Sequence, residues 1–354
     1  MQKKEPTDET RLIVGLPAGS LADPNRGGSL IRLLEHAGFP TKGYDRGGPS
    51  TFPITPFLVG WDGRPQEFGS QLALGELDVA IGGRDWMLER QLEFKYEYGQ
   101  DIEMQCVRSL DRGHVRIVII ARPEDAEKGL EAFLRELMAK PVVTMVSEMP
   151  YLAYDWFRMR VQESGLVEGD LPFSVQKFKT PPKIDRGLVI YETWGKTEAK
   201  VTHGAVDLGL EITQTGSAIR NYGLAMIDEV MESETTIWAR TDLKTCPEKY
   251  DLAKMFLLNL FGSINAEDKV LLFFNAKKQD VDGLLDYLGS NHLFGDEPTI
   301  NEGLNFTEFS IQLNAGSKEL PLARVRYELA KLGATAIETI PLDSSIPGLD
   351  VVDF

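Results

Sequence analysis

The sequence is poor in cysteine and histidine. Its 354 residues include two cysteines, Cys106 and Cys246, which stand far apart with no CxxC pair. This usage argues against a disulfide framework and against a cysteine-based zinc site. The four histidines, at positions 36, 114, 203 and 292, are equally scattered. No metal-binding residues can be named from spacing alone.

The chain also lacks an excess of basic residues and any long apolar run. It carries 54 acidic and 38 basic residues, for a formal net charge of −16, which does not suit binding to a phosphate backbone. The longest apolar runs, such as Val270 to Phe274, are far too short to span a bilayer. The polar start, MQKKEPTDET, has no apolar core of a signal peptide. We therefore expect a cytoplasmic protein that binds neither nucleic acid nor membrane.

Apolar strands alternate with helical segments through most of the chain. At 354 residues, two or three domains are expected. Continuously apolar strands are predicted at the segments 11–16, 77–81, 115–121 and 141–146, with a helix at 126–139 between the last two. Such strands, alternating with helices, predict parallel sheets covered on both faces. The region up to about residue 265 is predicted to be α/β, with two lobes around a cleft.

The pattern changes after Gly262 to Asn265, which we interpret as a hinge loop. Beyond it, strands and helices are predicted in the order βαββαβ within about 80 residues. In the strand 306–313, apolar residues alternate at Phe309, Ile311 and Leu313, as a sheet with one solvated face requires. This order predicts a ferredoxin-like or ACT-like α+β domain.

The segment Gly204 to Leu224, GAVDLGLEITQTGSAIRNYGL, carries the clearest functional pattern. An apolar strand ends in the carboxylate of Glu211, and a loop of small hydroxyl residues and glycine leads into a helix. Backbone N–H groups and hydroxyls in such a loop favour a phosphate, while the carboxylate can accept hydrogen bonds from a sugar diol. The pair of features suits 5-phosphoribosyl-1-pyrophosphate. The loop alone is equally consistent with an ordinary capped turn, because Thr and Ser are common caps.

The flanking sequence favours the first interpretation. Gly204 to Leu224 resembles the phosphoribosyl-pyrophosphate loop of the ATP phosphoribosyltransferase family, in its long form. Further segments resemble motifs of that family in the family's order, over nearly the whole chain: LPAGSL at 16–21, RPQE at 64–67, GELDVAIGGRDW at 75–86, VSEMP at 146–150, GKTEAKV at 195–201, EPTI at 297–300 and LGATAI at 332–337.

The resemblance implies an activity and a domain plan. The implied enzyme joins N1 of ATP to C1 of phosphoribosyl pyrophosphate, the first step of histidine biosynthesis, with Mg²⁺ on the pyrophosphate and histidine as feedback inhibitor. It implies a periplasmic-binding-protein-like catalytic region followed by a regulatory domain, in a homo-oligomer (hexamer or dimer). We place catalytic lobe I at 9–98 and 226–265, lobe II with the phosphate loop at 99–225, and the regulatory domain at 268–345.

The matched motifs also supply candidate site residues. Glu211, Arg64 and Glu198 are the candidates for catalysis. Phosphoribosyl pyrophosphate is expected at Glu211, Thr213, Gln214, Thr215, Gly216, Ser217 and Ala218. ATP or the leaving pyrophosphate is expected at Gly19, Arg64, Arg84, Asp85 and Glu148. Arginine gives bidentate phosphate contacts, although a single arginine is as often a solvated surface residue.

Four positions depart from the family pattern. Ala18 stands where the family usually has Lys, Gly82 and Ala218 where it has Thr, and Glu211 where it has Asp. These changes keep two alternatives open. One is a divergent phosphoribosyltransferase acting on another nucleobase-like acceptor, and the other is a non-catalytic small-molecule binding protein with the same two-lobed architecture.

Overall fold

The computed structural model describes residues 10–19, 29–46, 49–294 and 298–354. The chain divides into two compact units. Of the described residues, the first contains 10–19, 43–46, 49–51 and 56–250, and the second contains 29–42, 52–55, 251–294 and 298–354. Ser20, Leu21 and Glu297, which belong to two of the matched motifs, lie outside the described residues.

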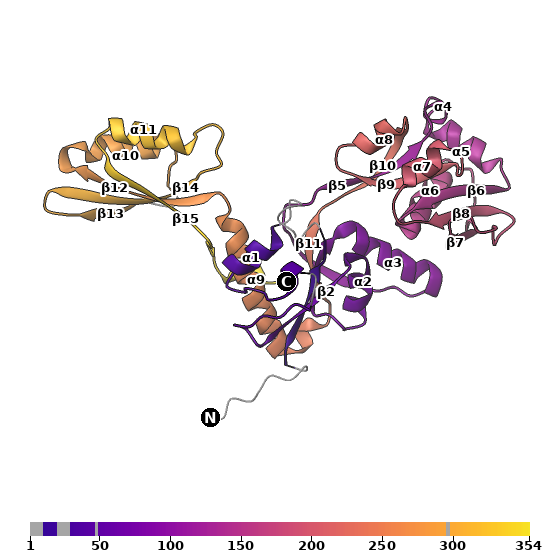
Figure 1. The fold of residues 1–354 in the computed structure, drawn as a ribbon, viewed down its shortest axis with the longest axis horizontal. Helices are drawn as coiled ribbons and strands as arrows, with labels where there is room; N and C mark the ends of the chain where they lie inside the picture. Colours follow the sequence, from indigo (N-terminus) through magenta and orange to yellow (C-terminus); the bar gives the residue numbers. More distant parts are fainter. Residues whose placement is uncertain (1–9, 20–28, 47–48, 295–297) are drawn as a thin grey trace. The chain divides into compact units, whose positions relative to one another are not determined.

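The first unit contains two mixed sheets (Figure 1). The first sheet has the strand order β2-β1-β3-β11-β4, in which β1 runs parallel to β2 and β3 while β11 is antiparallel to β3 and β4. Its strands and neighbouring helices are β1 (Leu12–Pro17), β2 (Leu58–Gly63), α2 (Pro65–Ala73), β3 (Val79–Gly83), α3 (Arg84–Tyr98), β4 (Met104–Ser109) and β11 (Thr235–Arg240), with short 3-10 turns at Tyr44–Arg46 and Leu243–Thr245.

The second sheet has the order β10-β5-β9-β6-β8-β7. Here β5 is antiparallel to β10 and β9, whereas β9, β6, β8 and β7 run parallel. The elements are β5 (Val115–Ala121), α4 (Pro123–Ala126), α5 (Leu130–Met138), β6 (Val142–Ser147), α6 (Pro150–Glu163), β7 (Phe173–Lys177), β8 (Gly187–Glu192), α7 (Thr197–Thr202), β9 (Leu208–Thr213), α8 (Ser217–Asn221) and β10 (Ala225–Ser233).

The two-lobed α/β fold class is confirmed, but the expectation of wholly parallel sheets is wrong. The chain crosses between the sheets twice, after β4 and after β10, and the strands at the crossings pair antiparallel. Strand β5 shows why the pattern misled, because it is as continuously buried as a central parallel strand. Both crossings lie later in the chain than the boundaries placed at 98/99 and 225/226. The pairing of β4 with β11 and of β10 with β5 determines which sheet each strand joins. Local composition does not reveal that pairing.

Helices α3 and α6 join the parts of the first unit that carry the two sheets. Glu89 of α3 is fully buried, and its two carboxyl oxygens accept the N–H groups of Tyr151 (3.1 Å) and Leu152 (2.8 Å) at the start of α6. Beside it, the rings of Tyr96 and Tyr154 meet edge to face with centroids 4.8 Å apart. Packing and hydrogen bonds therefore hold this junction together.

The second unit ends in the predicted α+β domain. The elements of this unit are α1 (Leu30–His36), most of α9 (Pro247–Ala266), β12 (Lys269–Lys277), a 3-10 turn at Lys278–Asp280, α10 (Val281–Ser290), β13 (Thr299–Glu302), β14 (Phe306–Asn314), α11 (Leu322–Lys331), β15 (Thr335–Pro341) and a 3-10 turn at Leu349–Val352. The antiparallel sheet has the order β13-β14-β12-β15, and Figure 1 shows α10 and α11 on one of its faces. This βαββαβ unit is the expected ferredoxin-like domain.

Burial in this domain follows the predicted alternation. Every second residue of β12 and β14 is buried, because helices cover one face of the sheet and leave the other partly exposed. Leu272, Phe274 and Phe309 contribute to a core that belongs to this domain, and the rings of Phe274 and Phe309 stack at 4.8 Å.

The hinge expected at Gly262 to Asn265 is wrong, because these residues lie inside α9. Gly262 is needed for close packing instead. A Cβ there would stand 2.6 Å from both Ile346 Cγ1 and Ser344 Oγ of the C-terminal segment. The N–H of Ser345 donates to the carbonyl of Gly262 at 2.8 Å. The C-terminal residues therefore pack against α9.

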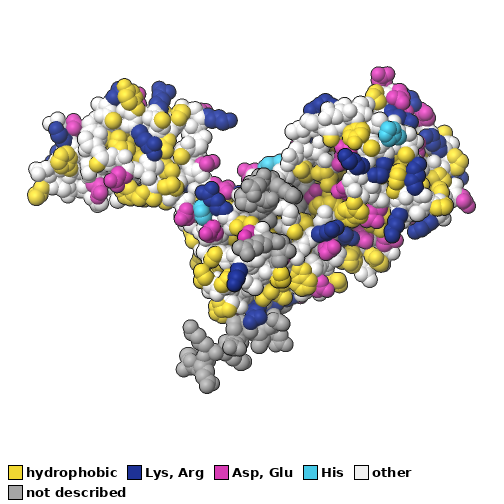
Figure 2. Space-filling view, viewed as in Figure 1, with side chains coloured by type: hydrophobic (Ala, Val, Ile, Leu, Met, Phe, Trp, Pro, Cys, Tyr) yellow, Lys and Arg dark blue, Asp and Glu magenta, His cyan; other side chains and the backbone are white. Residues whose placement is uncertain are grey.

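Surface charge is mixed in sign. In Figure 2, basic and acidic side chains are interspersed over the part of the molecule that contains the second sheet. Within the described ranges, no helix combines the length and apolarity needed to cross a membrane.

Candidate functional site

The turn from β9 to α8 has the geometry of a close-fitting loop. Gly216 is buried and has φ +69°, in the left-handed region that favours glycine. Its N–H donates to Thr213 Oγ1 at 2.8 Å, and the N–H of Ser217 donates to Thr215 Oγ1 at 3.3 Å. Arg220 donates to the carbonyl of Thr215 at 2.9 Å. Since α8 has only five residues, an anion here depends on the loop's amides and hydroxyls more than on a helix dipole.

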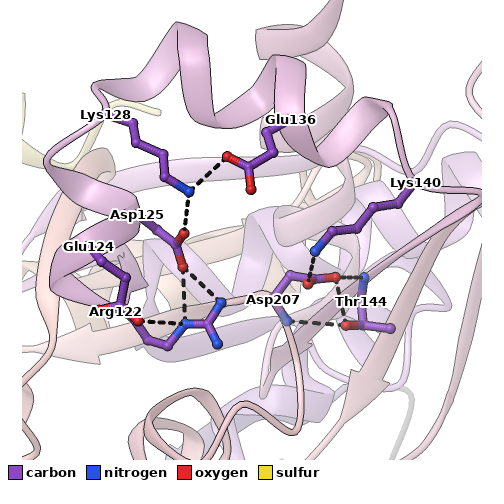
Figure 3. A network of polar contacts seen from close by, with 8 residues as sticks. All are labelled: Arg122, Glu124, Asp125, Lys128, Glu136, Lys140, Thr144 and Asp207. Atoms are coloured by element: carbon purple, nitrogen blue, oxygen red, sulfur yellow. Dashed lines mark hydrogen bonds and ion pairs between the residues drawn. The ribbon is translucent and has the colours of Figure 1, made fainter.

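A polar anchor fixes the strand that carries this loop (Figure 3). Asp207, just before β9, accepts the N–H of Thr144 at 2.8 Å and its hydroxyl at 2.9 Å. Lys140 forms an ion pair with the other carboxyl oxygen at 2.6 Å. Asp207 matches the family motif, and in this structure it joins β9 to β6. We assign it a positioning role for that reason.

Glu211, inside β9 and two residues before its end, lies in a cluster of acidic side chains. Burial, together with the nearby charges of Glu198 and Glu148, raises its pKa to about 7, against hydrogen bonds from Thr197 and from the Ile212 N–H. A carboxylate that titrates near neutral pH, with other carboxylates around it, is typical of a functional site.

Lys200 faces the same three glutamates. Burial lowers the pKa of Lys200, against the opposing charges of Glu148, Glu211 and Glu198. Its Nζ donates to the carbonyls of Gly195 (2.9 Å) and Lys196 (3.1 Å). Glu148 accepts the N–H of Gly195 from the other side. Lys200 and Glu148 therefore hold the turn between β8 and α7.

A cavity of about 490 Å³ in the first unit is lined by residues next to both sheets. Four candidates line it: Gly19, Arg64, Asp85 and Gln214. The lining does not include the other candidates, which are Glu211, Thr213, Thr215, Gly216, Ser217, Ala218, Glu198, Arg84 and Glu148. The structure thus brings Gln214, at the tip of the phosphate loop, to the cavity that contains Arg64, while Glu211 is adjacent in sequence to the lining residue Ile212.

Asp85 and Arg84 are adjacent, but the side chain of Asp85 is buried and that of Arg84 is exposed. Burial raises the pKa of Asp85, whose Oδ1 accepts the hydroxyl of Ser233 at 3.0 Å. A Cβ on Gly83 would lie 2.2 Å from that oxygen, so this position requires glycine. Arg84 is exposed, and its charge acts on the thiol of Cys106. Asp85 orders the start of α3 at the cavity, whereas Arg84 does not line the cavity and its charge acts on Cys106.

Sequence reasoning missed two groups near this cavity. Trp86 and Trp194 both line it, and their rings are stacked with centroids 6.5 Å apart and planes 13° from parallel. Trp86 lies inside a matched motif and Trp194 directly before another, which was the available signal.

The second missed group is Asp111, His114 and Glu234, whose ligand atoms all lie within 4.8 Å of one another. They come from the two crossings between the sheets, so spacing along the chain conceals them. Asp111 and His114 are exposed, and an imidazole is a poor ligand for Mg²⁺, which prefers oxygen.

Comparisons with known proteins agree with the motifs. The family model for ATP phosphoribosyltransferase (HisG) matches residues 64–259. An ATP phosphoribosyltransferase of Trichlorobacter lovleyi is 27% identical over 345 residues, covering 95% of this chain and 99% of the relative. One from Koribacter versatilis is 28% identical, covering 95% and 99%.

Among solved structures, a chain of the ATP phosphoribosyltransferase (HisG:HisZ) complex from Thermotoga maritima is similar in fold. Its TM-score is 0.50 at 16% sequence identity, covering 72% of this chain and 98% of that one.

Proposed function

Because this chain belongs to the ATP phosphoribosyltransferase family, we propose that its cavity and the adjoining β9–α8 loop join N1 of ATP to C1 of 5-phosphoribosyl-1-pyrophosphate. The activity is the transfer of a pentosyl group with release of pyrophosphate, the first step of histidine biosynthesis. The cytoplasm, where both substrates occur, is the proposed location.

The observation that carries this assignment is the loop from Glu211 to Ser217. It combines a half-buried carboxylate, a left-handed glycine and hydroxyls that bond their own backbone. We assign the 5-phosphate to the amides and hydroxyls of Thr213 to Ser217, which can exchange their internal bonds for phosphate oxygens. In this assignment Ala218 offers only its backbone N–H.

Glu211 is assigned to the ribose hydroxyls. Its ionised form accepts hydrogen bonds from a diol, and the transition state carries positive charge near C1 of the ribose. The charges of Glu211, Glu198 and Glu148 favour such a cation. Alignment of the two substrates supplies much of the rate, because the reaction needs little covalent help from the protein.

Arg64 is assigned to the phosphates of ATP or to the departing pyrophosphate. It lines the cavity with Gly19, whose lack of a side chain lets the phosphates approach the backbone. Asp85 and Glu148 act through the elements that they hold, α3 and the turn at Gly195. The exposed Arg84 is left to contact phosphate groups outside the cavity lining.

Mg²⁺ is proposed to arrive with the pyrophosphate, whose oxygens supply most of its ligands. This ion usually keeps several waters and uses few protein carboxylates. Asp111, His114 and Glu234 do not fit it, because one of the three ligands is a nitrogen.

The test of this function is direct. The full chain is incubated with ATP, phosphoribosyl pyrophosphate and Mg²⁺, and the absorbance of the adduct is followed with and without pyrophosphatase. We expect adduct that increases when pyrophosphatase removes the second product. No adduct with ATP, or an adduct only with another nucleobase, would overturn the assignment.

Residues 268–345 are proposed to form the regulatory domain, which binds histidine and supports a hexamer or dimer. The support is the separate core of the ferredoxin-like domain and the motif matches in it. Because inhibitor and substrates would bind different domains, their coupling should be reciprocal. Titration of the full chain with histidine, with and without ATP, tests this, and equal affinity in both would exclude coupling.

A further inference from the structure

Two indole rings face each other across the substrate cavity. Trp86 comes from the first turn of α3, and Trp194 from the turn between β8 and α7. Their planes are 13° from parallel and their centroids are 6.5 Å apart. Contacting aromatic planes lie about 3.5 Å apart, so a planar ring held between two others needs about 7 Å. The distance between the ring centroids is an upper limit on the distance between the two planes, so the rings must move apart before a base can lie between them.

The protein fixes Trp194 in an exposed position. Its side chain is 58% exposed, although a tryptophan is normally covered. The turn that carries it is bonded on both sides. The N–H of Thr193 donates to the carbonyl of Ser147 at 3.0 Å, and Lys200 and Glu148 bond the peptide groups of Gly195. A large aromatic side chain on a rigid turn beside a cavity is prepared to contact a ligand.

Trp86 is held equally well. The preceding residue, Asp85, bonds Ser233 through its N–H (3.1 Å) and its carboxyl (3.0 Å). Trp86 itself is half-buried and packs against the core of the second sheet. The two rings therefore stand on supports that do not depend on each other.

The same cavity offers an unpaired acceptor. The side-chain oxygen of Gln66 is buried and has no hydrogen-bond partner among the described residues. Buried acceptors in proteins are nearly always satisfied, so this oxygen still needs a donor, and a rotation of the Gln66 side chain would bring it to a ligand in the cavity. The exocyclic amino group of adenine is such a donor, and glutamine side chains pair with adenine in this way.

We propose that Trp86 and Trp194 clamp the purine base of the nucleotide substrate, and that Gln66 selects adenine by accepting its amino group. The clamp rests on the proposed function for the identity of the nucleotide, and it adds the residues that bind the base. Stacking tolerates any base, whereas the amide discriminates between a 6-amino and a 6-oxo purine.

The test measures binding by tryptophan fluorescence, without turnover. ATP should quench the fluorescence of the full chain, and inorganic tripolyphosphate, which has no base, should not. Trp194→Leu should weaken ATP binding about tenfold, whereas Trp194→Phe, which keeps an aromatic face, should lose about threefold at most. Binding of phosphoribosyl pyrophosphate should not change. Trp61→Leu is the matched control, because Trp61 is 44% exposed and does not line the cavity.

Gln66→Leu tests the selective contact. The wild-type chain should bind ATP better than inosine triphosphate, its 6-oxo analogue, and the variant should bind both about equally. Unchanged selectivity would remove Gln66 from the proposal.

Wild-type affinity for ATP in Trp194→Leu, or an equal loss for both substrates, would overturn the clamp. These outcomes are separate from the function test. Quenching by ATP without adduct formation would support the clamp and reject the transferase. Normal turnover with an unchanged KM for ATP in Trp194→Leu would support the transferase and reject the clamp.

Discussion

Two turns of the second sheet have the same local plan, a strand followed by the start of a helix. They differ in which groups accept the N–H groups at the start of that helix. At the start of α6, Met149 provides no side-chain cap, and the buried Glu89 of α3 accepts two first-turn N–H groups instead. At the start of α8, the capping bonds come from Thr213 and Thr215 of the same loop. The acceptors for the first turn come from another helix, whereas those for the second are hydroxyls of its own, mostly exposed loop.

The carboxyls near the two turns show the same difference. Burial raises the pKa of Glu89 to about 8 and that of Glu211 to about 7. Both oxygens of Glu89 are engaged by backbone N–H groups of another helix, whereas Glu211 accepts the N–H of its own neighbour, Ile212, and a side-chain hydrogen bond from Thr197. A raised pKa therefore does not by itself identify a substrate-binding carboxylate. The partners of its oxygens indicate whether it is structural or free to bind a ligand.

The largest expected effect comes from removing the Glu89 carboxyl, which accepts two N–H groups at the start of α6. Glu89→Ala leaves two buried N–H groups without acceptors and should lower the free energy of unfolding by about 3 kcal/mol. Urea unfolding measures it, with Glu103→Ala, at an exposed position, as control. Since folding raises the pKa of Glu89 from 4.5 to about 8, its contribution to stability is lost as pH rises through that range. Glu89→Gln should remove this pH dependence. A stability of Glu89→Ala equal to that of the wild type would contradict the structural role.

The next largest effect comes from distorting the loop between β9 and α8 at Gly216. Gly216→Val places a branched side chain at φ +69°, with its Cβ 3.0 Å from the guanidinium of Arg220. The left-handed conformation costs roughly 1–2 kcal/mol, so binding of phosphoribosyl pyrophosphate should weaken about tenfold or more. Calorimetry measures this. Gly223→Val is the matched control, because Gly223 has φ +68° and nothing within 4 Å of its added Cβ. Equal losses in the two variants would show that strain alone, outside the loop, accounts for the result.

A smaller effect is expected from neutralising Glu211. Because its pKa is about 7, phosphoribosyl pyrophosphate should bind more tightly as the pH rises from 6 to 8 and the carboxylate forms. Glu211→Gln should weaken binding at pH 8 by about 1–2 kcal/mol and flatten the profile. The control is Glu229→Gln, a change at another glutamate of the same sheet. A pH profile that persists in Glu211→Gln would assign the titration to a different group.

The smallest expected effect is electrostatic. Glu198→Gln removes one of the charges that raise the pKa of Glu211, so the binding profile should shift toward lower pH. Affinity at pH 8 should change little. The profile is measured by titration at several pH values, and a shift toward higher pH would show that Glu198 does not act on Glu211 through its charge.

Local patterns predicted much of the fold. The strand and helix order of residues 269–341 followed from apolar alternation, since near neighbours in sequence determine which face of a strand is buried. The phosphate loop was also predicted as a strand, loop and helix start. The hinge at Gly262 was wrong because glycine there serves a contact with Ile346, more than eighty positions away.

The sequence by itself determined the class of protein, the family and the loop around Gly216, because motifs and periodicity are properties of neighbouring residues. Only the tertiary structure decided that Asp207 anchors a strand, that Glu89 closes α6, and that Trp86 and Trp194 face each other. These relations join residues from separate strands and helices. Long-range strand pairing and helix packing create them, and no local pattern of the chain encodes the distances.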